Sequence, residues 1–448
     1  MTIIDRVSES AGLGHRDLAG CRQSVLTLGI RVFGAGAALL FNVIVARLLG
    51  ASDTGVFFLC IAIIVVAGTV CRAGLDTAAT KIIGREFAQN NWSAVRGLFR
   101  GSVALGFIFA VPAALLLYAF APFLADSLFG NQELTDPLRL LAPAIPLLTV
   151  LNIGAACFFG IQKPGMAFAL QNTMVPLFAT FGLLVPIGEH DVAVVSLVYV
   201  SSALLSCVLG GAGWRRHTRN FAATATFSRM REMLSLAPAM LAAAIMNRVV
   251  MRWSAVIFLG IWSTTTEVGM FAVTARLTLV LGFALTVANS IAAPRLSSQF
   301  ADGNLLALKS TVASAAIFAL SISAPMFMLF FLLPNWTMSL FGDEFRQAGS
   351  LLLILSAGEL INVVTGPVGV LLQMSKYERA YKNCTFAGGA IQIGLCLILI
   401  PKFGAIGAAI ATAVSMSATN FFAAAVSYKK LGIIPVPFMA GSRLVDRR

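Results

Sequence analysis

Residues 234–260 read LSLAPAMLAAAIMNRVVMRWSAVIFLG, and this stretch decides how the rest of the chain is interpreted. It is long enough to cross a bilayer, because about 20 apolar residues at 1.5 Å each span the hydrocarbon core. Yet it carries Asn247, Arg248 and Arg252 near its middle. An arginine at the bilayer centre costs about 2.5–3.5 kcal/mol on insertion scales. Since the two arginines are four residues apart, we expect both on one helical face, turned toward an interior that attracts an anion.

The composition is that of a polytopic membrane protein. Of 448 residues, 58% are hydrophobic and 11% are charged, whereas soluble domains carry about 25% charged residues. The net charge of +13 does not indicate nucleic acid, because Lys and Arg gather in alternate loops such as 72–100 and 214–233. The acidic loop 124–137 contains neither Lys nor Arg. This positive-inside pattern predicts that both chain ends are cytoplasmic.

Hydropathy predicts an all-α protein with twelve transmembrane helices. The expected spans are about 25–49, 55–75, 101–123, 138–160, 166–187, 192–213, 234–260, 267–291, 310–333, 347–373, 381–401 and 403–427. Prolines within spans favour kinks in those helices, and they are Pro112, Pro143, Pro146, Pro176, Pro325 and Pro367.

The two halves of the chain contain a weak internal repeat. The matched positions are Gly55 with Gly269, EFAQN (86–90) with QFADG (299–303), and Gln162 with Gln373. Six spans in each half, repeated in the same orientation, are typical of transporters whose site lies between two lobes. We therefore expect an N-lobe at 1–213, a basic cytoplasmic linker at 214–233, a C-lobe at 234–427 and a basic cytoplasmic tail at 428–448.

Four segments of the chain resemble the polysaccharide transporter branch of the MOP superfamily. They are ARLLGASDTGVF (46–57), EVGMFAVTARL (267–277), IAAPRLSSQFADGN (291–304) and FGAIGAAIATAVS (403–415). The resemblance implies a MATE-like fold of two six-helix bundles around a central cavity. It also implies a flippase that moves undecaprenyl-pyrophosphate-linked oligosaccharide from the cytoplasmic to the periplasmic leaflet of the bacterial inner membrane, for O-antigen or exopolysaccharide synthesis. The partners it implies are this lipid-linked oligosaccharide, the bilayer, and polysaccharide polymerase or export machinery.

Arginines deep within spans are the first candidates for substrate binding. Arginine binds phosphate groups bidentately and stays charged at any working pH. The alternative for each deep arginine is an interhelical salt bridge. Arg47 and Arg139 lie near span ends, where the side chain reaches the interface easily. The substrate-binding candidates are Arg31, Arg248, Arg252, Arg276 and Asn247.

Two carboxylates are candidates for ion coupling or gating. Glu359 lies deep within a span, where it either couples transport to H+ or Na+ or neutralises one of the arginines. Asp76 ends the second span one turn after Arg72, so a local ion pair is the alternative there.

Two rival functions remain at this point. A MATE-type multidrug or cation antiporter would share the fold, but it needs deep acids, and here four deep arginines face one deep glutamate. A membrane glycan polymerase or ligase would need a catalytic constellation, and none is evident, so we expect no enzyme. The His and Cys residues are scattered, so neither a metal nor a cofactor is expected.

Overall fold

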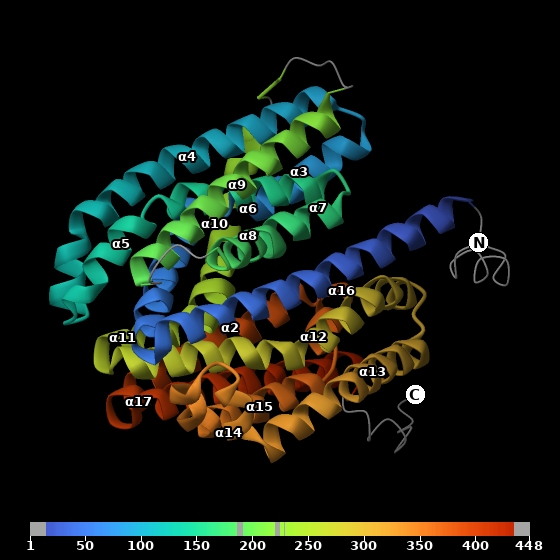
Figure 1. The fold of residues 1–448 in the computed structure, drawn as a ribbon. Coiled ribbons are helices and arrows are strands. Elements are labelled where there is room, and N and C mark those ends of the chain that lie inside the picture. Colours follow the sequence, from blue (N-terminus) through green and yellow to red (C-terminus); the bar gives the residue numbers. More distant parts are fainter. Residues whose placement is uncertain (1–14, 186–190, 220–224, 228, 434–448) are drawn as a thin grey trace. The chain divides into compact units, whose positions relative to one another are not determined.

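The computed structural model describes residues 15–185, 191–219, 225–227 and 229–433, and almost all of these residues are helical (Figure 1). The chain forms two compact units. Unit 1 comprises Met1–Phe41, Ala67–Phe120 and Leu138–Ala242, and unit 2 comprises Asn42–Val66, Ala121–Pro137 and Ala243–Arg448.

The first half of the chain contains α2 (His15–Cys71), α3 (Leu75–Ala88), α4 (Trp92–Phe123), the π-helical turn η1 (Leu124–Leu128), η2 (Gln132–Leu134), α5 (Thr135–Leu141), α6 (Ala144–Gly160), α7 (Pro164–Phe168), the π-helical turn η3 (Ala169–Thr173), α8 (Met174–Leu183) and α9 (Val192–Thr218). The second half contains α10 (Met230–Ala244), the π-helical turn η4 (Ile245–Val250), α11 (Met251–Trp262), α12 (Thr265–Ala301), α13 (Leu305–Leu332), α14 (Pro334–Ser339), η5 (Asp343–Ala348), α15 (Gly349–Val364), α16 (Val368–Met374) and α17 (Glu378–Leu431).

The helices account for the twelve expected spans. Nine helices of the described residues are long and apolar enough to cross a membrane, and the bent pair α5–α6 makes ten. Two of the nine, Leu26–Cys71 and Glu378–Leu431, contain 46 and 54 residues. Straight helices of these lengths would measure about 69 and 81 Å, more than twice the hydrocarbon core of about 30 Å. Each is broken once, at Gly50 and at Gly404, so each supplies two spans and the total is twelve.

Both breaks are built in the same way. Gly50 has φ 71° and Gly404 has φ 53°, a left-handed backbone that glycine adopts without strain. The backbone N–H after Gly50 donates to Glu344 Oε2 (2.6 Å), and the one after Gly404 donates to Glu267 Oε2 (2.8 Å). A carboxylate therefore caps each new helix start, where the helix dipole favours negative charge. Glu344 and Glu267 thus stabilise the two helix breaks in unit 2.

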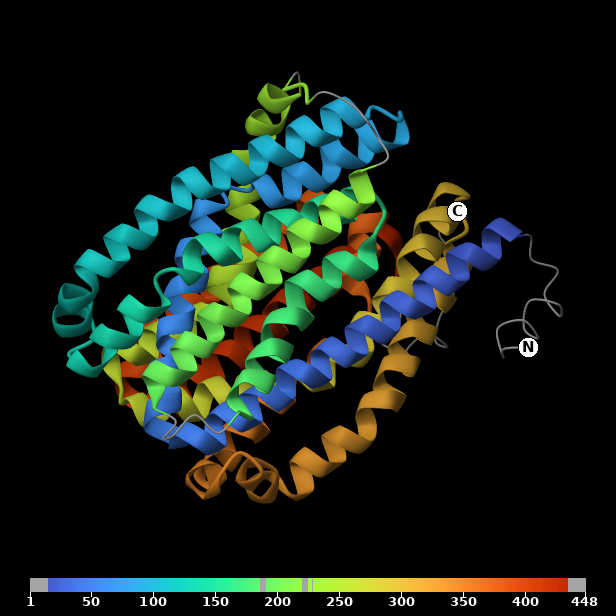
Figure 2. The same ribbon diagram turned by 45° about the horizontal axis from the view of Figure 1, so that its top comes forward.

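In unit 1, α6 packs against both α3 and α9. The helix α3 occupies much of the expected loop 72–100, so the prediction of a loop there was wrong. The buried residues of α3 recur at helical spacing, from Leu75 through Ile82 to Glu86, and this amphipathic pattern is too polar overall to register as a span. Figures 1 and 2 both show α4 and α9 running alongside each other, with the start of α4 near the end of α9.

In unit 2, α12 packs against α13 and α15, and α17 packs against α11 and α15. The expected single span 347–373 is two helices, α15 and α16, because Pro367 at the break lacks the N–H that a continuous helix needs. The kink expected at Pro143 is also present, since α5 and α6 meet there at 46°.

Gly55 and Gly269, which the repeat pairs, contact each other in unit 2. A Cβ on Gly55 would lie 1.8 Å from the Thr265 carbonyl oxygen, and one on Gly269 would lie 2.1 Å from that of Ala51. Each oxygen belongs to the residue four positions before the opposite glycine. Within a bilayer, where apolar burial does not drive helix association, small residues permit the close backbone approach that holds helices together.

The local backbone also follows the repeat. Asn90 and Gly303 end their helices with φ of 57° and 68°, and the same pair of backbone hydrogen bonds closes both turns. The pairing of Gln162 with Gln373 was wrong, because the left-handed residue that corresponds to Gln162 (φ 57°) is Lys376 (φ 63°). The backbone turns therefore match Gln162 with Lys376, which lies three residues after Gln373.

Candidate substrate-binding site

Three of the predicted site residues lie on one continuous helix, formed by α10, η4 and α11. The π-helical turn η4 contains Asn247 and Arg248, and Arg252 follows it in α11. Wide turns of this kind inside α-helices occur often at functional sites. Asn247 is exposed and donates to a carbonyl one turn back (2.9 Å), while Arg248 is half-buried and Arg252 is exposed.

Arg252 lies where several charges act on it. The negative charge of Glu359 and the positive charge of Arg248 both act on its guanidinium. Protein atoms surround Arg252 on most sides, although the residue remains accessible. Among the described residues it makes no hydrogen bond or salt bridge. Its donors are therefore available to an anion.

The carboxylate of Glu359 is buried, with 7% of the residue exposed, and polar side chains from two helices hold it. Asn362 Nδ2 on α15 donates to Glu359 Oε1 (2.9 Å). Asn420 Nδ2 on α17 in turn donates to Asn362 Oδ1 (3.1 Å). A hydrogen-bonded chain thus fixes the carboxylate near Arg252.

Gly282 on α12 completes this arrangement. A Cβ there would lie 2.1 Å from Glu359 Oε1, so any residue other than glycine would displace the carboxylate. We refer to Arg252, Gly282, Glu359, Asn362 and Asn420 as the Glu359 cluster. Sequence reasoning pointed to Arg252 and Glu359 but missed Gly282 and Asn420. A glycine among many and an asparagine late in the last span gave no signal.

Arg276 has partners of its own in unit 2. Its guanidinium lies 3.7 Å from the centroid of the Phe58 ring and 4.9 Å from that of Trp253. It also donates to the Ala272 carbonyl (2.8 Å). Cation–π contacts of this kind stabilise a desolvated arginine by roughly 2 kcal/mol. Arg276 therefore ties α12 to α11 beside Arg252, and its predicted contact with substrate stays a prediction.

The remaining predicted residues, Arg31 and Asp76, lie in unit 1. The half-buried guanidinium of Arg31 lies 3.7 Å from the Phe168 ring centroid. Asp76 Oδ2 is 3.5 Å from Arg72 Nε, so the local ion pair considered as the alternative is present. Roles in substrate binding or gating remain predictions for both residues. Within the described residues, no group of three or more His, Cys, Asp and Glu is placed to hold a metal ion.

The fold has clear relatives among solved structures. It matches an inward-facing multidrug resistance MATE family transporter of the MOP superfamily with a TM-score of 0.73, at 16% identity over 91% of this chain and 98% of that one. It matches lipid II flippase MurJ in an inward closed conformation with a TM-score of 0.71, at 15% identity over 92% of this chain and 88% of that one. The structure is thus a multi-pass membrane protein with the MOP fold, as the sequence predicted.

Residues 21–300 match the model of the polysaccharide biosynthesis protein family, and the chain belongs to that family. Over 403 residues it is 24% identical to a protein of Haloferax volcanii described as the probable low-salt glycan biosynthesis flippase Agl15. The match covers 90% of this chain and 81% of that relative. The predicted membership of the polysaccharide transporter branch is confirmed, and these relatives are transporters rather than enzymes.

Proposed function

We propose that this protein is a flippase that moves undecaprenyl-pyrophosphate-linked oligosaccharide repeat units from the cytoplasmic to the periplasmic leaflet. In this proposal it lies in the bacterial inner membrane with both termini cytoplasmic, and it supplies O-antigen or exopolysaccharide synthesis. Membership of the polysaccharide biosynthesis protein family supports the substrate class. The observation that carries the mechanism is Arg252, accessible and without a hydrogen bond among the described residues, beside a buried carboxylate.

The chemistry of the Glu359 cluster suits such a substrate. A pyrophosphate is an anion rich in acceptor oxygens, and a guanidinium binds it through two parallel hydrogen bonds. Arg248 adds a second positive charge on the same helix. When the pyrophosphate engages Arg252, its negative charge offsets the positive charge that acts on Glu359. Glu359 then takes up H+ or Na+, which couples the ion to substrate movement.

The proposal extends to the arrangement of the chain. The two halves, 1–213 and 234–427, act as lobes that alternate access to the substrate, with 214–233 as the cytoplasmic linker. Polysaccharide polymerase or export machinery then receives the flipped lipid.

Reconstitution tests the proposal directly. The full chain is placed in vesicles that contain undecaprenyl-pyrophosphate-linked oligosaccharide, and a membrane-impermeant glycosidase reports which leaflet holds the glycan. We expect Arg252→Ala to slow movement about ten- to hundredfold, because a hydrogen bond to a charged group contributes about 1.5–3 kcal/mol. Arg252→Lys keeps the positive charge but loses the planar guanidinium that donates two parallel hydrogen bonds, so it restores only part of the rate. Arg295→Ala, an exposed arginine on α12, is the control and leaves the rate unchanged.

A MATE-type multidrug or cation antiporter is the second candidate. The buried Glu359 favours it, because a carboxylate in a membrane interior attracts cations. In the same vesicles, movement of an organic cation that requires Glu359, with no movement of the lipid-linked glycan, would replace the flippase proposal. A glycan polymerase or ligase would instead lengthen or transfer the glycan, which its size distribution would reveal.

A further inference from the structure

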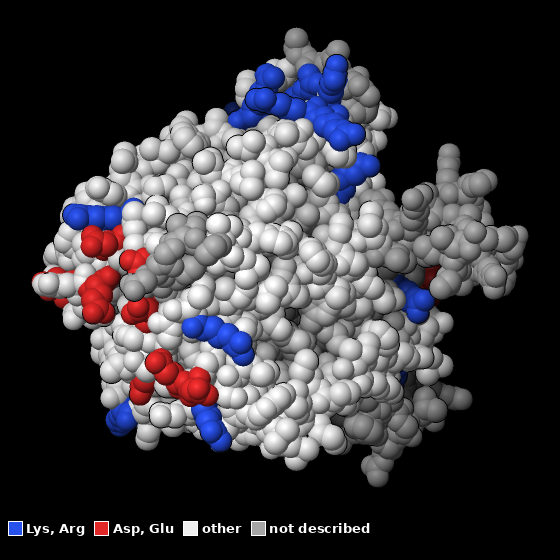
Figure 3. Space-filling model, in the orientation of Figure 1, with Lys and Arg blue, Asp and Glu red and all other residues white. Residues whose placement is uncertain are grey.

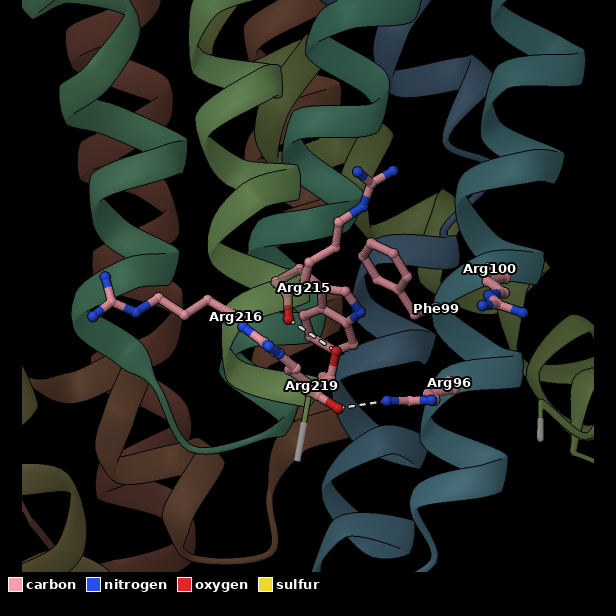
Figure 4. A pocket seen from close by; sticks show the side chains of 8 residues that line it. Arg96, Phe99, Arg100, Arg215, Arg216 and Arg219 are labelled. Atoms are coloured by element: carbon pink, nitrogen blue, oxygen red, sulfur yellow. Dashed lines mark hydrogen bonds between the residues drawn. The ribbon is translucent and has the colours of Figure 1, made fainter. Parts of the chain in front are cut away.

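An arginine-lined cavity lies in unit 1. None of its lining residues belongs to the Glu359 cluster, whose residues are all in unit 2. The cavity volume is about 720 Å³, and α4 and α9 line it (Figure 4). The rings of Phe99 and Trp214 stack across these two helices, with centroids 4.2 Å apart and planes 13° apart. The cavity arginines are Arg96, Arg100, Arg215, Arg216 and Arg219.

Four of these arginines form no ion pair with a carboxylate of the described residues, and they are Arg100, Arg215, Arg216 and Arg219. The sequence contains no Asp or Glu from 87 to 125 or from 192 to 231, so neither helix supplies one. Arg96 donates to the Thr218 carbonyl, which ties α4 to the end of α9 (Figure 4).

Two other arginines of unit 1 are paired with carboxylates. Arg85 donates to both carboxylate oxygens of Glu232 (2.8 Å each), and Arg229 Nε lies 3.2 Å from Glu86 Oε1. The hydrogen bonds to Glu232 and its negative charge raise the pKa of Arg85. Figure 3 shows Lys and Arg gathered over the end of unit 1 where α4 begins and α9 ends. Within this basic end, the cavity is where positive charge collects without carboxylates.

The helix dipole explains only part of this collection. Arg215 and Arg216 lie in the last turn of α9, where the dipole favours cations. Arg96 and Arg100 lie near the beginning of α4, where the dipole offers a cation no stabilisation. Arginines from a helix start and a helix end thus line one cavity, where a bound anion would reduce the repulsion between their like charges.

Exposed apolar side chains continue from the cavity along both helices. Seven residues correspond to about two turns, or about 10.5 Å, on the same helix face. Seven residues from Arg100 lies Phe107, which is 52% exposed, and seven residues from Arg215 lies Val208, which is 60% exposed. Leu209 stands in the same relation to Arg216 and is 40% exposed. Cationic groups above apolar surface match a molecule with an anionic head and hydrocarbon tails.

We propose that this cavity binds the phosphate-bearing headgroup of a membrane lipid, whose acyl chains lie along the exposed faces of α4 and α9. The phosphate oxygens accept hydrogen bonds from arginines of both helices. The stacked rings of Phe99 and Trp214 form a rigid part of the cavity wall. The bound lipid holds the start of α4 to the end of α9. The proposal uses no residue of the Glu359 cluster, so its test does not depend on the flippase assignment.

Lipid binding to the purified full chain tests this proposal. Native mass spectrometry and thermal unfolding are followed as phosphatidylglycerol is added in detergent. The cavity variant is Arg100→Ala/Arg216→Ala, which removes two exposed arginines. The control is Lys81→Ala/Arg231→Ala, which removes two exposed charges of unit 1 that do not line the cavity. The same measurements are made with two comparison ligands. Phosphatidylcholine has the phosphate but no net charge, and soluble glycerol phosphate has no acyl chains.

We expect phosphatidylglycerol to bind the wild type and the control alike, and the cavity variant at least about tenfold more weakly, because the variant loses two charged hydrogen-bond donors to the phosphate. Weaker binding of phosphatidylcholine and glycerol phosphate to the wild type supports a site that needs both anionic head and tails. Equal losses in the two double variants would overturn the proposal, because net charge alone would then explain binding. Equal stabilisation by glycerol phosphate would also overturn it, in favour of a site for soluble anions.

Discussion

Gly282→Ala tests whether the position of the Glu359 carboxylate matters for transport. The new Cβ would lie 2.1 Å from Glu359 Oε1. Non-bonded carbon and oxygen atoms need roughly 3.3 Å, so the carboxylate must move by about 1 Å or more. The oxygen is the free end of a flexible side chain, so α12 and α15 need not separate. We expect a stability loss near the lower end of the about 1–3 kcal/mol that overpacking costs.

The displacement of the carboxylate should also slow transport. The displaced carboxylate loses the 2.9 Å hydrogen bond from Asn362, and Asn420 loses its ordered partner. A hydrogen bond to a charged group contributes about 1.5–3 kcal/mol, and about 1.4 kcal/mol corresponds to a tenfold change. We therefore expect the flipping rate to fall about ten- to hundredfold.

The vesicle assay with the membrane-impermeant glycosidase measures the rate, and thermal unfolding of the purified protein measures stability. Gly394→Ala is the matched control, because Gly394 lies in α17 with open space where its Cβ would be. The reasoning fails if Gly282→Ala transports at the wild-type rate. It also fails if Gly394→Ala slows transport equally, since the loss would then not depend on the carboxylate.

Three further changes probe other parts of the structure. Gly55→Ala places its Cβ 1.8 Å from a backbone oxygen that cannot rotate away. We therefore expect the free energy of unfolding to fall by more than about 3 kcal/mol, as measured by thermal unfolding. Gly211→Ala is the control, because its Cβ would face open space and should not lower stability. Glu359→Gln removes the titrating group, so the pH or Na+ dependence of flipping should flatten; an unchanged profile would leave Glu359 as a structural partner of Arg252. Glu344→Ala removes the cap of the break at Gly50 and should cost about 1 kcal/mol in unfolding, with exposed Asp343→Ala as the silent comparison.

Hydropathy was sufficient to predict the spans, because the bilayer requires about 20 apolar residues wherever a helix crosses it. The breaks at Gly50 and Gly404 fall where the sequence separates adjacent spans, since a left-handed residue is needed there. The helix α3 was missed because its alternation of buried and polar residues lowers its mean hydropathy. Hydropathy identifies long apolar helices and overlooks amphipathic ones such as α3.

The site was only partly predictable for a different physical reason. An arginine in an apolar run stands out because its insertion is costly, so Arg248 and Arg252 were evident. The residues that position Glu359 are neutral: Gly282 contributes only the absence of a side chain, and Asn420 acts through a second asparagine. Such contacts depend on which helices meet. A single sequence does not contain that information.

The contact between Gly55 and Gly269 has the form of an isologous interface, the kind that joins two copies in a symmetric homodimer. The same backbone patch from each half meets its counterpart, with the carbonyl oxygens of Thr265 and Ala51 in equivalent places. Fusion of two such copies into one chain would preserve this contact while freeing the other surfaces to diverge. A bulkier side chain at either glycine would separate the same two helices, so substitutions at the two positions should have the same structural effect.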